Sequence, residues 1–172
     1  MIIDVHGHAG PWFFSTEVGS VELNLALMDR YGIERQVVSA SEAVTYDMVS
    51  GNSWLAEVLE TQPRLLGYVV VNPNDLAVAA RELERYRPTG RFVGVKVHTT
   101  YRGRPLMSAA VRDALRLAAE AGLPVLVHPW DETVLGLVDV LEADLTDDEY
   151  DHVMWRNAVG LFGLEAATDP TA

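Results

Sequence analysis

The sequence has no cysteine among its 172 residues, no long apolar run and few basic side chains. Without cysteine there is no disulfide bond, no thiolate nucleophile and no cysteine-ligated zinc site. No apolar stretch approaches the ~18 residues that a membrane-spanning helix needs, and the N-terminus lacks the regions of a signal peptide. These absences favour a cytoplasmic protein that does not enter a membrane.

The shortage of basic side chains leaves the chain strongly acidic. Thirteen Lys and Arg residues stand against 25 Asp and Glu residues, so the formal net charge is -12 at pH 7. Such a charge repels the phosphates of nucleic acids and of anionic lipids, and neither is an expected partner. The acidic residues between 139 and 151 are interpreted as a solvated helical face rather than a cation site.

Short apolar runs alternate with helical patterns through the first 131 residues. Five runs are predicted to be strands: residues 2–8, 33–39, 65–71, 92–98 and 123–128. Four segments between them are predicted to be helices: residues 21–31, 54–62, 75–86 and 106–121. Residues 45–52 are expected to form a loop. The alternation indicates βαβ units and a parallel sheet.

After residue 131 the pattern indicates helix only, over residues 132–142 and from 146 to about 162. Thr146, followed three residues later by Glu149, is a capping-box pattern that predicts the start of the second helix. We expect a single domain over residues 1–172, with βα units over 1–131 and C-terminal helices over 132–164.

Histidines lie at the ends of three predicted strands. His6 and His8 alternate with Asp4 along the first strand, where residues two apart share a face. His98 ends the fourth strand and His128 ends the fifth. Because parallel strands end on the same side of a sheet, four of the five histidines are expected to converge.

Converging neutral imidazoles suit Zn²⁺ and similar ions, so this pattern predicts a metal or acid–base site. Lys96 lies on the same strand face as His98. It either binds an anionic substrate or is a buried lysine paired with Asp4, and the sequence leaves both open. His152 lies in the acidic C-terminal helix and is expected at the surface.

The opening Ile-Asp-Val-His-Gly-His, residues 3–8, resembles the Asp-x-His-x-His signature of the amidohydrolase superfamily. Further segments are similar, in order, to the amidohydrolase-related branch, which includes decarboxylases of aromatic and muconate-type acids: residues 52–56, 63–67, 71–73, 94–98, 122–128 and 157–164. This resemblance implies that His6, His8 and His128 bind a metal, usually Zn²⁺ or another divalent ion. It further implies a hydrolase or lyase that acts on a small, carboxylate-bearing substrate through a metal-activated water.

The chain also departs from the family pattern. The family fold is a (β/α)₈ barrel of ~250 residues, whereas only five strands are visible here. The family's sixth-strand His and eighth-strand Asp have no matching position. We therefore predict an α/β fold, an incomplete (β/α)₈ TIM-barrel-like domain with about five parallel strands and extra C-terminal helices.

Without the family's Asp, we predict that the base is Asp131, His98 or a residue of a partner subunit, or that the chain has none, with Lys96 as the substrate-binding residue. Two alternatives to an active enzyme with a small-molecule substrate remain. In the first, the chain is a catalytically impaired remnant that binds metal or a protein partner. In the second, a homodimer completes one barrel from two incomplete ones. An exposed sheet edge at the first or fifth strand motivates the homodimer.

Overall fold

The computed structural model describes residues 2–14, 18–130, 136, 146–151, 156 and 160. The chain divides into two compact units, Met1–Trp130 and Asp131–Ala172. In the second unit, helix α7 (Asp147–Asp151) begins directly after Thr146, as the capping pattern predicts. The described residues exclude all of residues 131–135 and His152, and most of the predicted helix 132–142 and of the last helix. The single-domain arrangement therefore stays a prediction.

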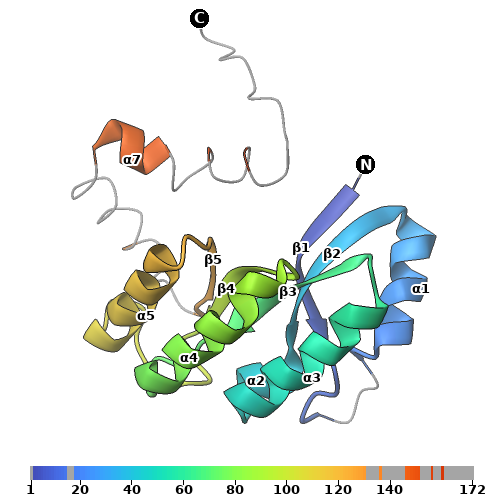
Figure 1. Cartoon of the computed structure of the whole chain (residues 1–172), viewed down its shortest axis with the longest axis horizontal. Coiled ribbons are helices and arrows are strands. Elements are labelled where there is room, and N and C mark those ends of the chain that lie inside the picture. Colours follow the sequence, from blue (N-terminus) through green and yellow to red (C-terminus); the bar gives the residue numbers. More distant parts are fainter. Residues whose placement is uncertain are drawn as a thin grey trace, which may run out of the picture. The chain divides into compact units, whose positions relative to one another are not determined.

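Five parallel strands form a curled half-barrel in the first unit (Figure 1), which confirms the predicted incomplete TIM-barrel-like fold. The strands lie in chain order: β1 (Ile2–Ala9), β2 (Ile33–Ala40), β3 (Leu65–Val70), β4 (Phe92–His98) and β5 (Val125–His128). Sequential order is expected of successive right-handed βαβ units. The carboxyl ends of all five strands therefore lie at one rim.

Helices cover the sheet between successive strands (Figure 1). They are α1 (Val21–Tyr31), α2 (Ser41–Thr45), α3 (Met48–Thr61), α4 (Leu76–Tyr86), the 3-10 turn η1 (Arg87–Thr89) and α5 (Ala109–Glu120). Four of these helices begin at a side chain that accepts a backbone hydrogen bond from the residue three positions later: Ser20, Asp47, Asp75 and Ser108. Such caps satisfy amides that a helix start leaves unpaired.

The loop predicted at residues 45–52 is wrong, because α3 begins at Met48. The Asp47 carboxylate accepts from the Ser50 amide at 2.8 Å and starts the helix six residues earlier than the apolar spacing suggests. Ser50, Gly51 and Asn52 lack apolar periodicity, so their turn of helix is visible only through its cap.

The middle of the sheet is more buried than its edges. In β3 and β4 all but two residues are buried, whereas every residue of β5 is only half-buried. A strand covered by helices and flanked on both sides is expected to be continuously apolar, as β3 is. The edges at β1 and β5 are where a second copy would have to add strands, and the homodimer stays a prediction tested by the mass in solution.

Strand β1 contains a register shift. Asp4 pairs with Gln36 and Gly7 with Val38, so three steps along β1 match two steps along β2. The strict alternation predicted for Asp4, His6 and His8 is therefore interrupted. The Tyr68 hydroxyl of β3 donates to the Val5 carbonyl at 2.8 Å, across the inside of the curled sheet.

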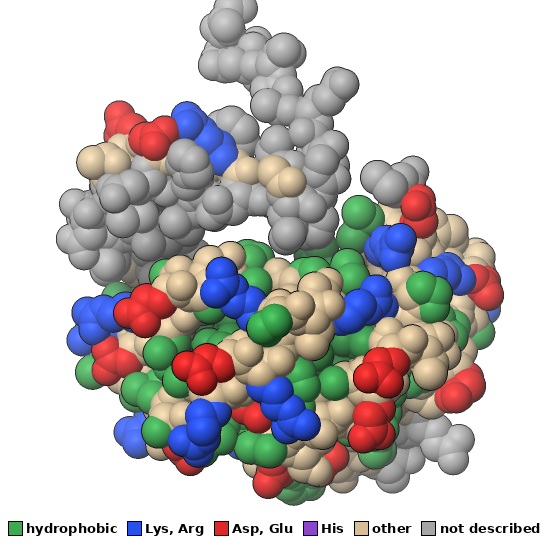
Figure 2. Space-filling view, viewed as in Figure 1, with side chains coloured by type: hydrophobic (Ala, Val, Ile, Leu, Met, Phe, Trp, Pro, Cys, Tyr) green, Lys and Arg blue, Asp and Glu red, His purple; other side chains and the backbone are tan. Residues whose placement is uncertain are grey.

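Two observations describe the helices and the surface of the described residues. Among the helices of the described residues, none has the length and apolar character needed to cross a bilayer. On the face shown in Figure 2, basic and acidic side chains are interspersed rather than gathered in a patch of one sign.

Gly51 brings α3 into close contact with α2, and replacing it with alanine is expected to destabilise the fold. A Cβ at this position would lie 2.2 Å from the Ala43 backbone nitrogen, which cannot rotate away. We expect Gly51→Ala to lower the free energy of unfolding by about 1–3 kcal/mol, as overpacking does. Urea denaturation measures the change, and Ser53→Ala on the same helix is the control, expected within about 0.5 kcal/mol of wild type. Equal stabilities for the two variants would refute the packing argument.

Candidate active site

Four histidine rings meet at the carboxyl-end rim of the sheet, as predicted. The ring centroids of His6 and His8 lie 5.6 Å apart, and those of His6 and His128 lie 5.2 Å apart. The His98 ring is 4.5 Å from the His128 ring. Strands β1, β4 and β5 thus contribute to one cluster, although β1 and β5 are at opposite edges of the sheet.

Lys96 joins this cluster through His6. Its Nζ donates a hydrogen bond to His6 Nε2 at 3.0 Å, and its side chain is fully buried. Asp4 is engaged elsewhere, because it accepts hydrogen bonds from the Gln36 side chain at 2.8 Å and from the His6 backbone amide at 2.9 Å. Lys96 therefore contacts the His6 imidazole. The pairing of Lys96 with Asp4, one of the two arrangements that the sequence left open, is not the one seen.

Burial sets the protonation of the cluster. It lowers the pKa of His8 to about 3 and that of His98 to about 4, with nearby Lys96 and the other rings adding to the shift. Burial, then Lys96, also lowers the pKa of His6 and of His128. These imidazoles are therefore neutral at pH 7, the form that binds metal. Burial lowers the pKa of Lys96 to about 8, which leaves it cationic at pH 7.

The donor chemistry fits a divalent cation, and one buried atom supports this. His128 Nδ1 is buried without a hydrogen-bond partner in the structure. Ser39 Oγ lies 3.0 Å from His8 Nδ1 and orients that ring, as outer partners of metal-binding imidazoles do.

In their present conformations, the described side chains do not form a complete metal site. Within the described ranges, no three His, Asp or Glu side chains are placed to hold one ion together. Two nitrogens are engaged by protein donors: His6 Nε2 by Lys96 and His128 Nε2 by Trp130 Nε1, the latter at 2.8 Å. These side chains would have to rotate before His6, His8 and His128 could share an ion, so that assignment remains a prediction.

Aromatic side chains that the sequence analysis did not select line the cluster. The Tyr101 ring stacks on His98 at 4.2 Å, and the Trp130 ring lies 5.2 Å from Tyr101. On the other side, the Trp12 ring is 4.8 Å from His8. Each follows a histidine of the cluster by two to four residues in the sequence, and this position is the signal that could have identified them.

Among the described residues, no carboxylate is hydrogen-bonded to any of the four imidazole rings of the cluster, as a base would be. Asp131, predicted as a catalytic residue from its place after Trp130, lies outside the described residues. His98 is buried beside His128 and keeps its predicted position, while its catalytic role is untested.

The buried imidazoles predict that acid destabilises the fold. His98 has a pKa of about 4 in the folded chain and about 6.5 when unfolded, so the unfolded chain binds more protons between these values. Stability is therefore expected to fall as the pH drops from about 6.5 to about 4, by at most about 1.4 kcal/mol per pH unit for this one group. Denaturant titrations of wild type and His98→Gln measure the effect. A variant with the wild-type slope over this range would contradict it.

Comparisons with known proteins bear on the family and the fold of the chain. A family profile described as Amidohydrolase matches residues 3–143. The 5-carboxyvanillate decarboxylase of Novosphingobium aromaticivorans, solved with manganese and a nitro-substituted aromatic acid, is 18% identical with a TM-score of 0.62; the match covers 83% of this chain and 55% of that one.

Two further solved structures are similar. The 5-carboxyvanillate decarboxylase of Sphingomonas paucimobilis is 17% identical, with a TM-score of 0.57 and coverage of 92% of this chain and 61% of that one. The 2,6-dihydroxybenzoate decarboxylase of Rhizobium is 19% identical, with a TM-score of 0.59 and coverage of 90% and 54%. No match was found among curated proteins.

The matched structures establish the fold, and the family profile covers most of the sequence. The chain spans little more than half the length of the solved structures that it matches, 55% for the first of them. The sequence signature at residues 3–8, the half-barrel and the profile match over residues 3–143 agree. This chain belongs to the amidohydrolase family.

Proposed function

We propose that the histidine cluster is a divalent-metal site of the amidohydrolase type, acting on a small carboxylate-bearing substrate. The observation that carries the proposal is the convergence of four neutral imidazoles and one buried lysine at the strand ends. His6, His8 and His128 would hold the cation, Zn²⁺ or Mn²⁺, in a site with three protein ligands. When bound, the cation lowers the pKa of a water and polarises the substrate.

Lys96 is proposed to bind the substrate carboxylate. Lys96 is the only lysine in the sequence, and its side chain is buried within the cluster. A buried cation needs an anionic partner, because an isolated charge is poorly solvated there. A substrate carboxylate would supply that partner and would release His6 Nε2 for metal binding.

Tyr101 and Trp130 are proposed to hold the body of the substrate. Their rings lie beside His98, and Trp130 is 61% exposed, so one aromatic wall of the cluster faces solvent. An aromatic ring stacks favourably on such a wall. The decarboxylases similar to this chain act on aromatic acids, as their names state, which agrees with an aromatic carboxylic acid here.

An assay of the metal-loaded chain tests the proposal. We expect Mn²⁺- or Zn²⁺-dependent turnover of at least one member of a panel of aromatic carboxylic acids, lactones and amides. His8→Ala should abolish it, and Lys96→Met should raise KM for carboxylates more than for neutral substrates. Turnover that survives His8→Ala, or that needs no metal, would refute the assignment.

The second candidate is an impaired remnant that binds metal without turnover. The observation that favours it is the lack of a carboxylate hydrogen-bonded to the rings among the described residues. Loss of a general base commonly costs about 10²–10⁴-fold in rate. Metal-dependent binding of an aromatic carboxylate without turnover, measured by calorimetry, would support the remnant over the enzyme.

A further inference from the structure

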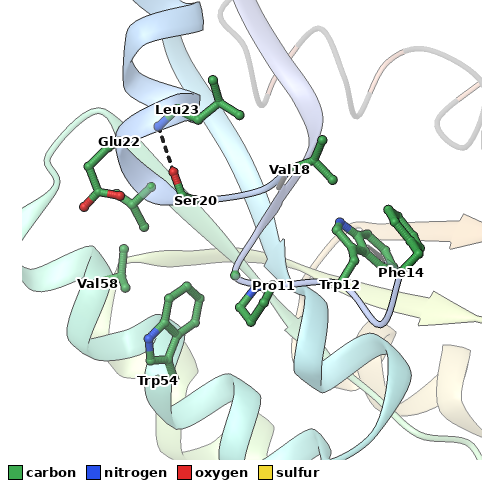
Figure 3. Close-up of a pocket in the computed structure, with 11 residues that line it drawn as sticks. Pro11, Trp12, Phe14, Val18, Ser20, Glu22, Leu23, Trp54 and Val58 are labelled. Atoms are coloured by element: carbon green, nitrogen blue, oxygen red, sulfur yellow. Dashed lines mark hydrogen bonds between the residues drawn. The ribbon is translucent and has the colours of Figure 1, made fainter. Parts of the chain in front are cut away.

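A cavity outside the histidine cluster opens between the start of α1, the loop after β1 and helix α3 (Figure 3). Its volume is about 910 Å³, the larger of the two described cavities. The residues that line this cavity do not include His6, His98, His128 or Lys96. Trp12 lines it and also contacts the His8 ring at 4.8 Å, so this indole separates the cavity from the cluster.

Aromatic rings form two sides of this cavity. Trp12 and Phe14 stack with centroids 5.5 Å apart and planes only 12° from parallel. Trp54, on α3, packs against the Gly10 backbone, where an added Cβ would lie 3.2 Å from its ring. Figure 3 shows Trp54 beside Pro11, apart from the Trp12–Phe14 pair. The rings present flat apolar faces suited to a planar ligand.

Apolar side chains at the rim remain exposed. Phe14 is 46% exposed and Val18 is 42% exposed. Leu23, on the first turn of α1, is 37% exposed. Apolar surface gathered around a concave site marks a place where a ligand is bound.

Among the described residues that line the cavity, Glu22 carries the only charge. Figure 3 shows its side chain on the same side as Val58, away from Trp12 and Phe14. Leu23 N donates to Ser20 Oγ at 3.1 Å and Asn24 N donates to the Ser20 carbonyl, so these two amides at the start of α1 are already paired and are not free to bind an anion. A cavity lined by aromatic rings and by one carboxylate suits a ligand that is both aromatic and cationic.

We propose that this cavity binds an aromatic amine, with the ring against Trp54 and the Trp12–Phe14 pair and the ammonium at Glu22. This inference makes no use of the metal and goes beyond the proposed enzymatic function.

Equilibrium dialysis of the full chain with tryptamine tests the inference, with chelator present so that metal does not contribute. The matched comparison is 3-methylindole, which has the same ring without the amine. We expect saturable binding of both, with tryptamine about two- to tenfold tighter, the size of one exposed ion pair with a cation–π contact. Glu22→Gln should remove this difference, whereas Glu60→Gln, exposed on α3 and outside the cavity, should keep it.

Trp54→Ala should weaken both ligands, and His128→Ala should affect neither, because His128 does not line the cavity. Loss of tryptamine binding in His128→Ala would show that the ligand binds at the histidine cluster, and would overturn the inference. Equal affinities for the two ligands, or no saturable binding, would also overturn it. A dimer in sedimentation that Trp54→Ala converts to a monomer would assign the cavity to a second copy and reject the amine.

Discussion

Replacing His8 with alanine is expected to weaken binding of Mn²⁺ or Zn²⁺ more than about 100-fold. Loss of an outer-shell partner alone commonly costs about 10–100-fold, and His8 is proposed as one of three direct ligands. The expectation rests on a neutral ring held by Ser39 at 3.0 Å within 5.6 Å of the His6 ring. Competition with a chelating dye measures the affinity without requiring turnover.

Two controls separate ligand loss from unfolding. Ser39→Ala removes the hydrogen bond to His8 Nδ1 and should weaken metal binding less than His8→Ala does. His152→Ala lies in the sequence outside the proposed site and should leave the affinity unchanged. Wild-type affinity in His8→Ala, with the fold intact by circular dichroism, would remove His8 from the ligand set.

Replacing Asn52 with leucine should destabilise the fold by about 2–5 kcal/mol, because three buried polar groups lose their partner. The Asn52 side chain is fully buried on α3. Its Oδ1 accepts from Val70 N at 3.0 Å, and its Nδ2 donates to the Val70 carbonyl and to Glu82 Oε2, both at 3.1 Å. It thereby links α3 to β3 and α4. Chemical denaturation measures the loss.

The double variant Asn52→Leu with Glu82→Leu sharpens this test. Glu82 is a buried carboxyl whose pKa is raised by burial and lowered again by its hydrogen bond from Asn52. Removing the donor alone leaves a buried acid unsatisfied, whereas replacing both partners with apolar groups removes that penalty. The double variant should therefore be more stable than Asn52→Leu. Strictly additive losses would show that the two side chains do not interact.

Most of the fold of the first unit could be predicted from apolar periodicity. The runs in β3 and β4 are continuous because those strands are buried, and that character is readable without coordinates. The early start of α3 could not be read from apolar spacing, because Asp47 caps a turn of polar and small residues. The register shift in β1 was equally hidden, since it depends on how Asp4 and Gly7 pair with β2.

The histidine cluster was predictable because four imidazoles stand at strand ends, a position that topology brings together. Partner choice was not predictable: Lys96 reaches His6 rather than Asp4 only because the sheet curls and Gln36 occupies the carboxylate. The contact between Trp130 and His128 depends on a side-chain rotation after Pro129, which no sequence pattern specifies.

The central claim is that His6, His8 and His128 bind one divalent cation. Anomalous diffraction at the manganese edge, from crystals of the chain grown with Mn²⁺, tests this claim most directly. We predict one strong peak at the rim of the half-barrel, within about 2.0–2.3 Å of a nitrogen of each ring, with Lys96 and Trp130 withdrawn from His6 and His128. A well-ordered rim without a peak, or a peak bound elsewhere, would contradict it.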